Sequence, residues 1–91
     1  MQVAWRRRAL ADVSRIARYI AQDNPVAAAR VTRALTTAAD SLARLPEKGR
    51  PGLVLGTREL SAVPPYVIVY RVEREAQTIT ILRIWHTAQD R

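Results

Sequence analysis

Apolar residues in the first half of the chain recur three or four positions apart, in two successive segments. The first segment runs from about Arg6 to Gln22, and the second runs from Pro25 to the residues before Pro46. This spacing is typical of one apolar face on an α-helix. Asn24 and Pro25 suit an N-cap and a first helical position, so the pattern predicts a helical hairpin. A short apolar strand over residues 2–5 precedes it.

The apolar residues of the second half follow the two-residue period of β-strands. After a loop over residues 46–52, strands are predicted over 57–63, 66–72 and 78–86. Pro64-Pro65 and the polar segment 73–76 separate these strands as turns. The chain is therefore expected to form one α+β domain over residues 1–91, in the order β-α-α-β-β-β, with an antiparallel sheet packed against the helical hairpin.

Charged side chains on the last two strands need either a partner or a ligand, because the positions around them are apolar. A hairpin centred on the polar turn would pair Arg71 with Ile79 and Arg83 with Val67. On that register the two arginines share one face with Ile79, and His86, the only histidine, lies on the other face.

Composition and charge narrow the kinds of function. There is no cysteine, so disulfides and cysteine metal sites are excluded, and a single histidine excludes a multi-histidine metal site. Neither a membrane-length apolar run nor a signal peptide is found, so we expect a soluble cytoplasmic protein without membrane association.

Fourteen of the fifteen basic residues are arginine, and the net charge is +7. Residues 1–46 contribute +5 of that charge, from eight arginines and three acids. Arginine makes bidentate contacts with carboxylate and phosphate, so the composition indicates a partner rich in one of these groups.

Short sequence words occur along nearly the whole chain in the order found in one bacterial family. They are Ile16-Ala17-Arg18-Tyr19-Ile20-Ala21, Asp23-Asn24-Pro25, Leu45-Pro46 with Gly49-Arg50, Gly56-Thr57-Arg58-Glu59-Leu60, Pro65-Tyr66-Val67-Ile68-Val69-Tyr70-Arg71-Val72 and Ile81-Leu82-Arg83-Ile84-Trp85-His86. On these words the chain resembles the RelE/ParE superfamily of type II toxin–antitoxin modules. The resemblance implies a toxin that a cognate antitoxin binds tightly, with neither a cofactor nor a small-molecule substrate.

Two branches of this superfamily have different targets. RelE-like members cut mRNA on the ribosome without a metal, and ParE-like members inhibit DNA gyrase with no established chemistry of their own. The nuclease branch commonly has an arginine directly after the position that matches Tyr66, where this chain has Val67. It often carries further loop cations, where this chain has only Lys48 and Arg50. The resemblance therefore favours a ParE-like toxin that inhibits DNA gyrase by binding and not as an enzyme.

Two alternatives stay open at this point. One is a RelE-like endoribonuclease, because metal-free RNA cleavage needs a base, cations and a proton donor. Its candidate catalytic residues are His86, Arg58, Glu47 and Arg83. The other alternative is a degenerate member that binds antitoxin without being toxic. His86 also has a plainer interpretation as a surface residue at a strand end.

Binding candidates fall into two sets. The residues expected to contact the target lie on the strands and are Arg58, Arg71, Arg83, Trp85 and His86. The residues expected to receive an acidic antitoxin segment lie on the helices and are Arg15, Arg18, Arg30 and Arg33.

Overall fold

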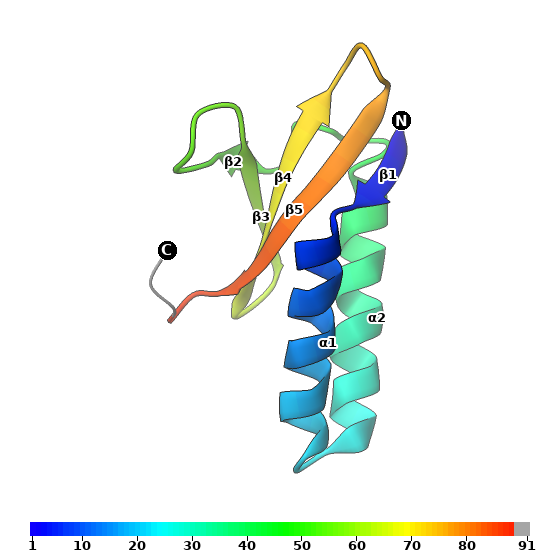
Figure 1. Cartoon of the computed structure of the whole chain (residues 1–91), viewed down its shortest axis with the longest axis vertical. Helices are drawn as coiled ribbons and strands as arrows, with labels where there is room; N and C mark the ends of the chain where they lie inside the picture. Colours follow the sequence, from blue (N-terminus) through cyan, green and yellow to red (C-terminus); the bar gives the residue numbers. More distant parts are fainter. Residues whose placement is uncertain (89–91) are drawn as a thin grey trace.

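The computed structural model describes residues 1–88 as two helices and a five-stranded sheet (Figure 1). The elements in chain order are β1 (Gln2–Trp5), α1 (Arg7–Ala21), α2 (Pro25–Ser41), β2 (Arg50–Pro51), β3 (Arg58–Val63), β4 (Tyr66–Glu73) and β5 (Thr78–His86). The α+β class and the helical hairpin confirm the expectation. Across this described part, no helix combines the length and the apolar character needed to cross a membrane.

The sheet has the strand order β1-β5-β4-β3-β2. It is mixed, whereas the sequence analysis predicts a purely antiparallel sheet. The first strand runs parallel to β5, with Gln2 opposite Thr78 and Trp5 opposite Ile81. The helical hairpin is the crossover that makes this parallel pairing feasible. The additional strand, β2, has only two residues, which is too short to produce an alternating pattern in the sequence.

The ends of the helices follow from local hydrogen bonding. Asn24 caps α2 as predicted, because its side-chain oxygen accepts the N–H of Ala27 at 3.0 Å. That helix ends at Ser41, earlier than expected, where the hydroxyl donates to the carbonyl of Ala38 at 2.6 Å. By contrast, α1 begins after Arg6 with neither a side-chain cap nor an acidic residue in its first turn.

The hydrophobic core lies between the hairpin and one face of the sheet, called the inner face below. Buried side chains of α1, of α2 and of its C-cap residue meet those of β3, β4 and β5. They include Ala9, Leu35, Ala39, Leu42, Leu60, Ile68, Tyr70, Ile79, Ile81 and Ile84. Each fully buried Leu or Ile side chain contributes about 1.5–3 kcal/mol to folding. The turn between the helices projects past the sheet, which gives the molecule extents of 42 × 26 × 21 Å (Figure 1).

Tyr70 connects the loop before β2 to this core. Its hydroxyl donates to the carbonyl of Pro46 at 2.7 Å and accepts the N–H of Gly49 at 2.9 Å. A Cβ atom at Gly49 would lie 2.8 Å from the Tyr70 ring. Only glycine therefore fits at this point of the loop.

The β4–β5 hairpin contains a bulge that changes the predicted register. Arg83 pairs with Val69, and Arg71 pairs with Thr80, so both predicted pairings are wrong. The ladder shifts because Leu82 has no partner opposite it. This extra residue turns Arg83 away from the inner face. Arg83 and Ile79 therefore lie on different faces, whereas the sequence predicts that they share one. The two arginines do share the outer face, as predicted, and His86 lies on the inner face.

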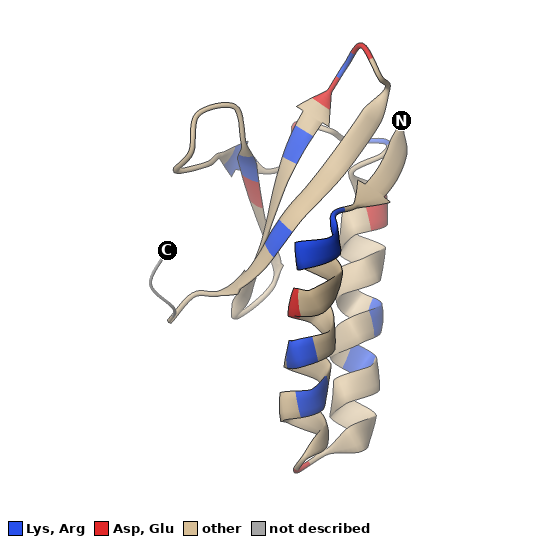
Figure 2. Cartoon of the chain, in the orientation of Figure 1, with Lys and Arg blue, Asp and Glu red and all other residues tan. Residues whose placement is uncertain are grey.

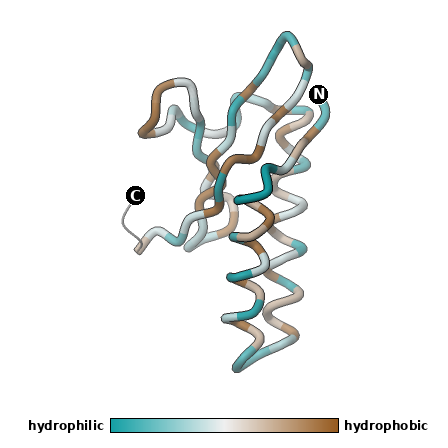
Figure 3. Tube along the Cα trace, in the orientation of Figure 1, coloured by the Kyte–Doolittle hydropathy of each residue, from teal (hydrophilic) through white to brown (hydrophobic). Residues whose placement is uncertain are grey.

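The loop between β2 and β3 contains three consecutive aliphatic residues, and the Cα trace is coloured brown at this loop in Figure 3. Leu53, Val54 and Leu55 are 75%, 65% and 98% exposed. The loop is nevertheless held by backbone hydrogen bonds, including Gly52 N–H to Thr57 O at 2.8 Å.

Candidate functional site

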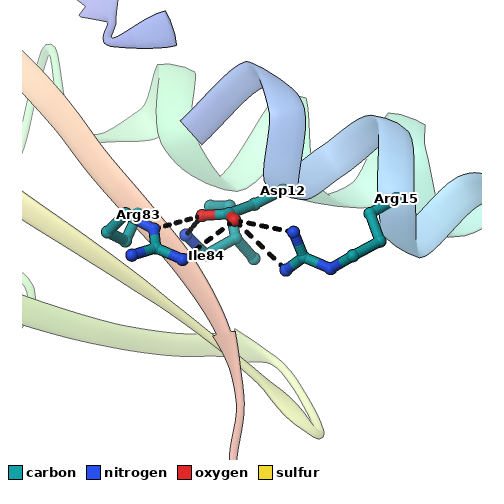
Figure 4. A network of polar contacts seen from close by, with 4 residues as sticks. All are labelled: Asp12, Arg15, Arg83 and Ile84. Atoms are coloured by element: carbon teal, nitrogen blue, oxygen red, sulfur yellow. Dashed lines mark hydrogen bonds and ion pairs between the residues drawn. The ribbon is translucent and has the colours of Figure 1, made fainter. Parts of the chain in front are cut away.

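A buried carboxylate on α1 fixes the second half of β5 (Figure 4). Asp12 is 2% exposed, and its Oδ2 atom accepts both the Ile84 N–H and the Arg83 Nε–H at 2.8 Å. Its Oδ1 atom accepts Arg83 Nη2 at 3.2 Å and both terminal nitrogens of Arg15 at 3.1 Å. Since β1 pairs with β5 only as far as Ile81, the carboxylate supplies the hydrogen bond that a neighbouring strand would otherwise give to Ile84.

Asp12 is ionised in this setting. Burial raises the pKa of its carboxyl, but the hydrogen bonds from Arg83, Ile84 and Arg15 outweigh burial and leave the pKa below the ordinary value of 3.8. The hydrogen bond to Asp12 likewise raises the pKa of Arg83. The charged group on β5 thus has an internal partner.

Sequence reasoning missed Asp12, although a signal was present. An acidic residue stands three positions after Ala9 and four before Ile16, inside the apolar stripe of α1. A carboxylate at such a position is buried and must find donors on the element that packs against the helix.

On the outer face, Arg83 lies beside Trp85. The guanidinium carbon is 4.2 Å from the indole centroid, a cation–π contact. Trp85 pairs with Val67, and Arg71 is two positions along β4 from Val69, which pairs with Arg83. The structure therefore brings Arg71, Arg83 and Trp85 onto one surface, called the outer β5 surface below.

His86 lies on the opposite side of the sheet from this surface. Its ring packs edge-on against Tyr66, with centroids 5.5 Å apart and planes at 89°. The imidazole also lines a hollow of about 340 Å³ with Arg15 and Tyr19 from α1. Its Nδ1 atom accepts the N–H of Ala88 at 3.0 Å. His86 thus lies on the face of the sheet that packs against the helices, while Arg83 and Trp85 lie on the other face.

The remaining candidates, Arg58 and Glu47, lie elsewhere. Arg58 donates to the carbonyl of Gly49 at 2.8 Å and pairs with Tyr70 on β4, whereas His86 pairs with Tyr66. Tyr66 and Tyr70 are four positions apart on β4, which corresponds to an offset of about 13 Å along the strand.

Glu47 forms a close ion pair with Arg74. Arg58 and Arg74 border a separate hollow of about 270 Å³. The four nuclease candidates therefore do not form one cluster. Within residues 1–88, no group of three or more His, Asp or Glu side chains could hold a metal ion.

Basic residues lie along both helices (Figure 2), and the structure divides the four antitoxin candidates between them. Arg15 and Arg18 belong to α1, and Arg15 is bound to Asp12. Arg30 and Arg33 instead border a hollow of about 450 Å³ between α2 and β3, together with Lys48.

The lining of this hollow includes the apolar side chains of Ala34, Ala38 and Val63. We call it the α2 groove. It joins three cations to an apolar surface, and neither Arg15 nor Arg18 lines it.

Comparisons with known proteins agree on one family. The sequence model of the ParE toxin of type II toxin–antitoxin systems matches residues 3–91. The chain is 52% identical over 89 residues to the toxin RelE2 of Caulobacter vibrioides and covers 97% of both proteins. It is 43% identical over 82 residues to the putative toxin Y4kP of Sinorhizobium fredii, covering 89% of this chain and 85% of that protein.

Two solved structures share the fold. The chromosomal ParDE toxin–antitoxin system from P. aeruginosa matches with a TM-score of 0.82 and 29% identity, over 94% of this chain and 95% of that chain. The RelBE2 toxin–antitoxin complex from Mycobacterium tuberculosis matches with a TM-score of 0.72 and 26% identity, over 93% and 95%. The chain therefore belongs to the ParE toxin family of the RelE/ParE superfamily, as the toxin of a type II toxin–antitoxin system.

Proposed function

We propose that this toxin inhibits DNA gyrase by binding it through the outer β5 surface, trapping the cleaved gyrase–DNA state, and that a cognate antitoxin neutralises it. The arrangement of the candidate catalytic groups is the main support. Metal-free RNA cleavage requires a base and cations within hydrogen-bonding reach of one phosphate. Here His86 and Arg83 lie on opposite faces of β5. The residues of β4 that pair with Arg58 and with His86 are about 13 Å apart along that strand.

The outer β5 surface instead has the residue types that dominate protein interfaces. Tryptophan and arginine are enriched among the side chains whose truncation costs a complex most of its binding energy. Trp85 is partly exposed and Arg71 lies on the same face. Val67, which stands where the nuclease branch commonly has arginine, pairs with Trp85 but is only 3% exposed, so it offers no cation to a phosphate.

A gyrase supercoiling assay with the purified toxin tests the proposal. Trp85→Ala should raise the toxin concentration needed for half-inhibition by about 30-fold, corresponding to about 2 kcal/mol of lost binding. Tyr19→Ala, at an exposed aromatic residue of α1, is the matched control and should inhibit like the wild type. If the wild-type toxin leaves supercoiling unchanged at any excess over gyrase, the gyrase proposal fails.

A ribosome-dependent endoribonuclease is the second candidate. It is favoured by the name of the 52% identical relative, the toxin RelE2, and by the fold shared with the RelBE2 complex. Primer extension on translated mRNA after toxin induction would detect cuts in the ribosomal A site. If such cuts appear and His86→Ala abolishes them, the nuclease proposal replaces the gyrase proposal.

The antitoxin proposal rests on the α2 groove. An acidic amphipathic segment would place its carboxylates near Arg30 and Arg33 and its apolar side chains over Ala38 and Val63. Reversing both arginine charges to glutamate should weaken antitoxin binding by at least about tenfold, because like charges across an interface are repulsive. Arg18→Glu is the control from α1, and titration calorimetry with the cognate antitoxin is the measurement.

A further inference from the structure

Four arginines line one hollow between the start of α1 and β5. The hollow has a volume of about 380 Å³, and its lining residues are Arg6, Arg7, Arg8, Leu82 and Arg83. We call it the arginine hollow. Figure 2 shows the blue start of α1 beside the blue position on β5. Residues 6–15 together with Arg83 carry five arginines and one aspartate, a net of +4 out of the chain's +7.

The side chains of the three N-terminal arginines of this hollow make no polar contact that stabilises the described part of the fold. Among residues 1–88, the side chains of Arg6, Arg7 and Arg8 form neither an ion pair nor a hydrogen bond. They are exposed, and they repel one another and the positive end of the α1 dipole. They therefore oppose folding in the isolated toxin, and an anion in the hollow would reverse the sign of that contribution.

The fourth arginine is already held in place. Asp12 fixes the Arg83 guanidinium through Nε and Nη2, so little side-chain freedom is lost when an anion approaches. The bulge at Leu82 is what turns Arg83 away from the core. One arginine held by Asp12 and three exposed arginines line the same hollow.

The lining of the hollow distinguishes two kinds of anionic partner. An acidic peptide segment needs apolar contacts as well as cations, which the α2 groove offers, whereas the arginine hollow has Leu82 as its single apolar residue. A phosphodiester backbone presents closely spaced charges without apolar groups, and arginine forks match phosphate geometry. We propose that the arginine hollow binds the phosphate backbone of nucleic acid.

This inference deepens the gyrase proposal, since a toxin that traps a gyrase–DNA state could contact the DNA as well as the enzyme. It does not depend on that proposal for its test. Duplex DNA and single-stranded RNA share the phosphodiester chemistry, so both serve as probes. Their salt dependences differ, with a slope of log K against log salt of about −0.9 per neutralised phosphate for duplex DNA and about −0.7 for single strands.

Fluorescence anisotropy without gyrase or ribosomes is the experiment. Wild-type toxin is titrated into labelled duplex DNA and into labelled RNA of the same length, between about 50 and 200 mM salt. The variant Arg6→Gln/Arg7→Gln/Arg8→Gln should bind at least one probe about 10²-fold more weakly, with the slope of log K reduced by about 2–3. Its melting temperature should equal or exceed that of the wild type, because the substitutions remove charge repulsion at the start of α1.

A matched control removes the same charge elsewhere. Arg18→Gln/Arg44→Gln/Arg74→Gln removes three exposed arginines outside both the arginine hollow and the α2 groove, and it should retain the wild-type slope. Equal losses in the two triple variants would show a diffuse effect of net charge and overturn the proposal. Absence of salt-dependent binding of wild-type toxin to both probes would also overturn it. Binding of DNA without gyrase inhibition would instead support the hollow and contradict only the gyrase proposal.

Discussion

Replacing Asp12 by asparagine tests whether this carboxylate holds α1 to the sheet. Asparagine keeps the shape of the side chain and one acceptor oxygen, but it removes the charge. The remaining oxygen can still accept the Ile84 N–H, so the loss falls on the two arginines. The Arg83 side chain is 21% exposed and the Arg15 side chain is 48% exposed, so the two lost contacts contribute unequally to stability.

The magnitude follows from these environments. Charge-assisted hydrogen bonds contribute about 1.5–3 kcal/mol each, and the solvent-screened contact with Arg15 contributes less than about 1 kcal/mol. We expect Asp12→Asn to lower the free energy of unfolding by about 3 kcal/mol, at the lower end of the range for breaking a buried ion pair. For a domain of this size, that change lowers the melting temperature by about 12–24 °C.

Thermal unfolding monitored by circular dichroism is the assay. Asp40→Asn, on the exposed side of α2, changes the net charge equally and should leave the melting temperature within about 2 °C of the wild type. Because the folded-state pKa of Asp12 is lowered, its stabilisation is fully present above the ordinary value of 3.8 and is lost as the pH falls through the folded-state value. The difference in melting temperature between the wild type and Asp12→Asn should therefore become smaller below pH 3.8.

Two results would refute this reasoning. One is a melting temperature for Asp12→Asn that matches those of the wild type and Asp40→Asn. The other is a difference in melting temperature that stays constant as the pH falls well below 3.8. This would mean that the folded state does not favour the ionised form of Asp12.

Other substitutions test the loop before β2 and the loop between β2 and β3. Tyr70→Phe should cost about 1–3 kcal/mol in urea denaturation, because the carbonyl of Pro46 and the N–H of Gly49 lose a buried partner, whereas Tyr19→Phe at the surface should change stability by less than about 0.5 kcal/mol. Gly49→Ala should cost about 1–3 kcal/mol in the same measurement, since its Cβ would lie 2.8 Å from the Tyr70 hydroxyl. Leu55→Ser should leave the unfolding free energy within about 0.5 kcal/mol of the wild type, as measured by thermal unfolding.

Locally determined features were predictable from the sequence. The helical hairpin and the three long strands follow from periods that extend over many residues, and the cap at Asn24 follows from a single side chain and its neighbours. The order and type of these elements needed no knowledge of distant contacts. The family resemblance added the toxin identity, which the comparisons confirm.

Features that depend on long-range contacts were not predictable. The bulge at Leu82 shifts the register of β5, and the alternation of apolar residues gives no sign of it. Arg83 was recognisable as a charge in need of a partner, but Asp12 could be identified as that partner only once α1 was known to pack against β5. The separation of His86 from Arg83 follows from strand alternation, whereas the distance from Arg58 required the sheet order.

The Asp12–Ile84 hydrogen bond also sets the order in which the toxin can mature during synthesis. It joins groups 72 positions apart, and β1 likewise waits for β5 to supply its only strand partner. At a translation rate of about 5–20 residues per second, α1 is complete for several seconds before its anchor on β5 exists. The outer β5 surface is assembled after both helices have been made. Each newly made toxin molecule therefore passes through an interval in which the helical hairpin is available to a partner while the surface around Trp85 does not yet exist.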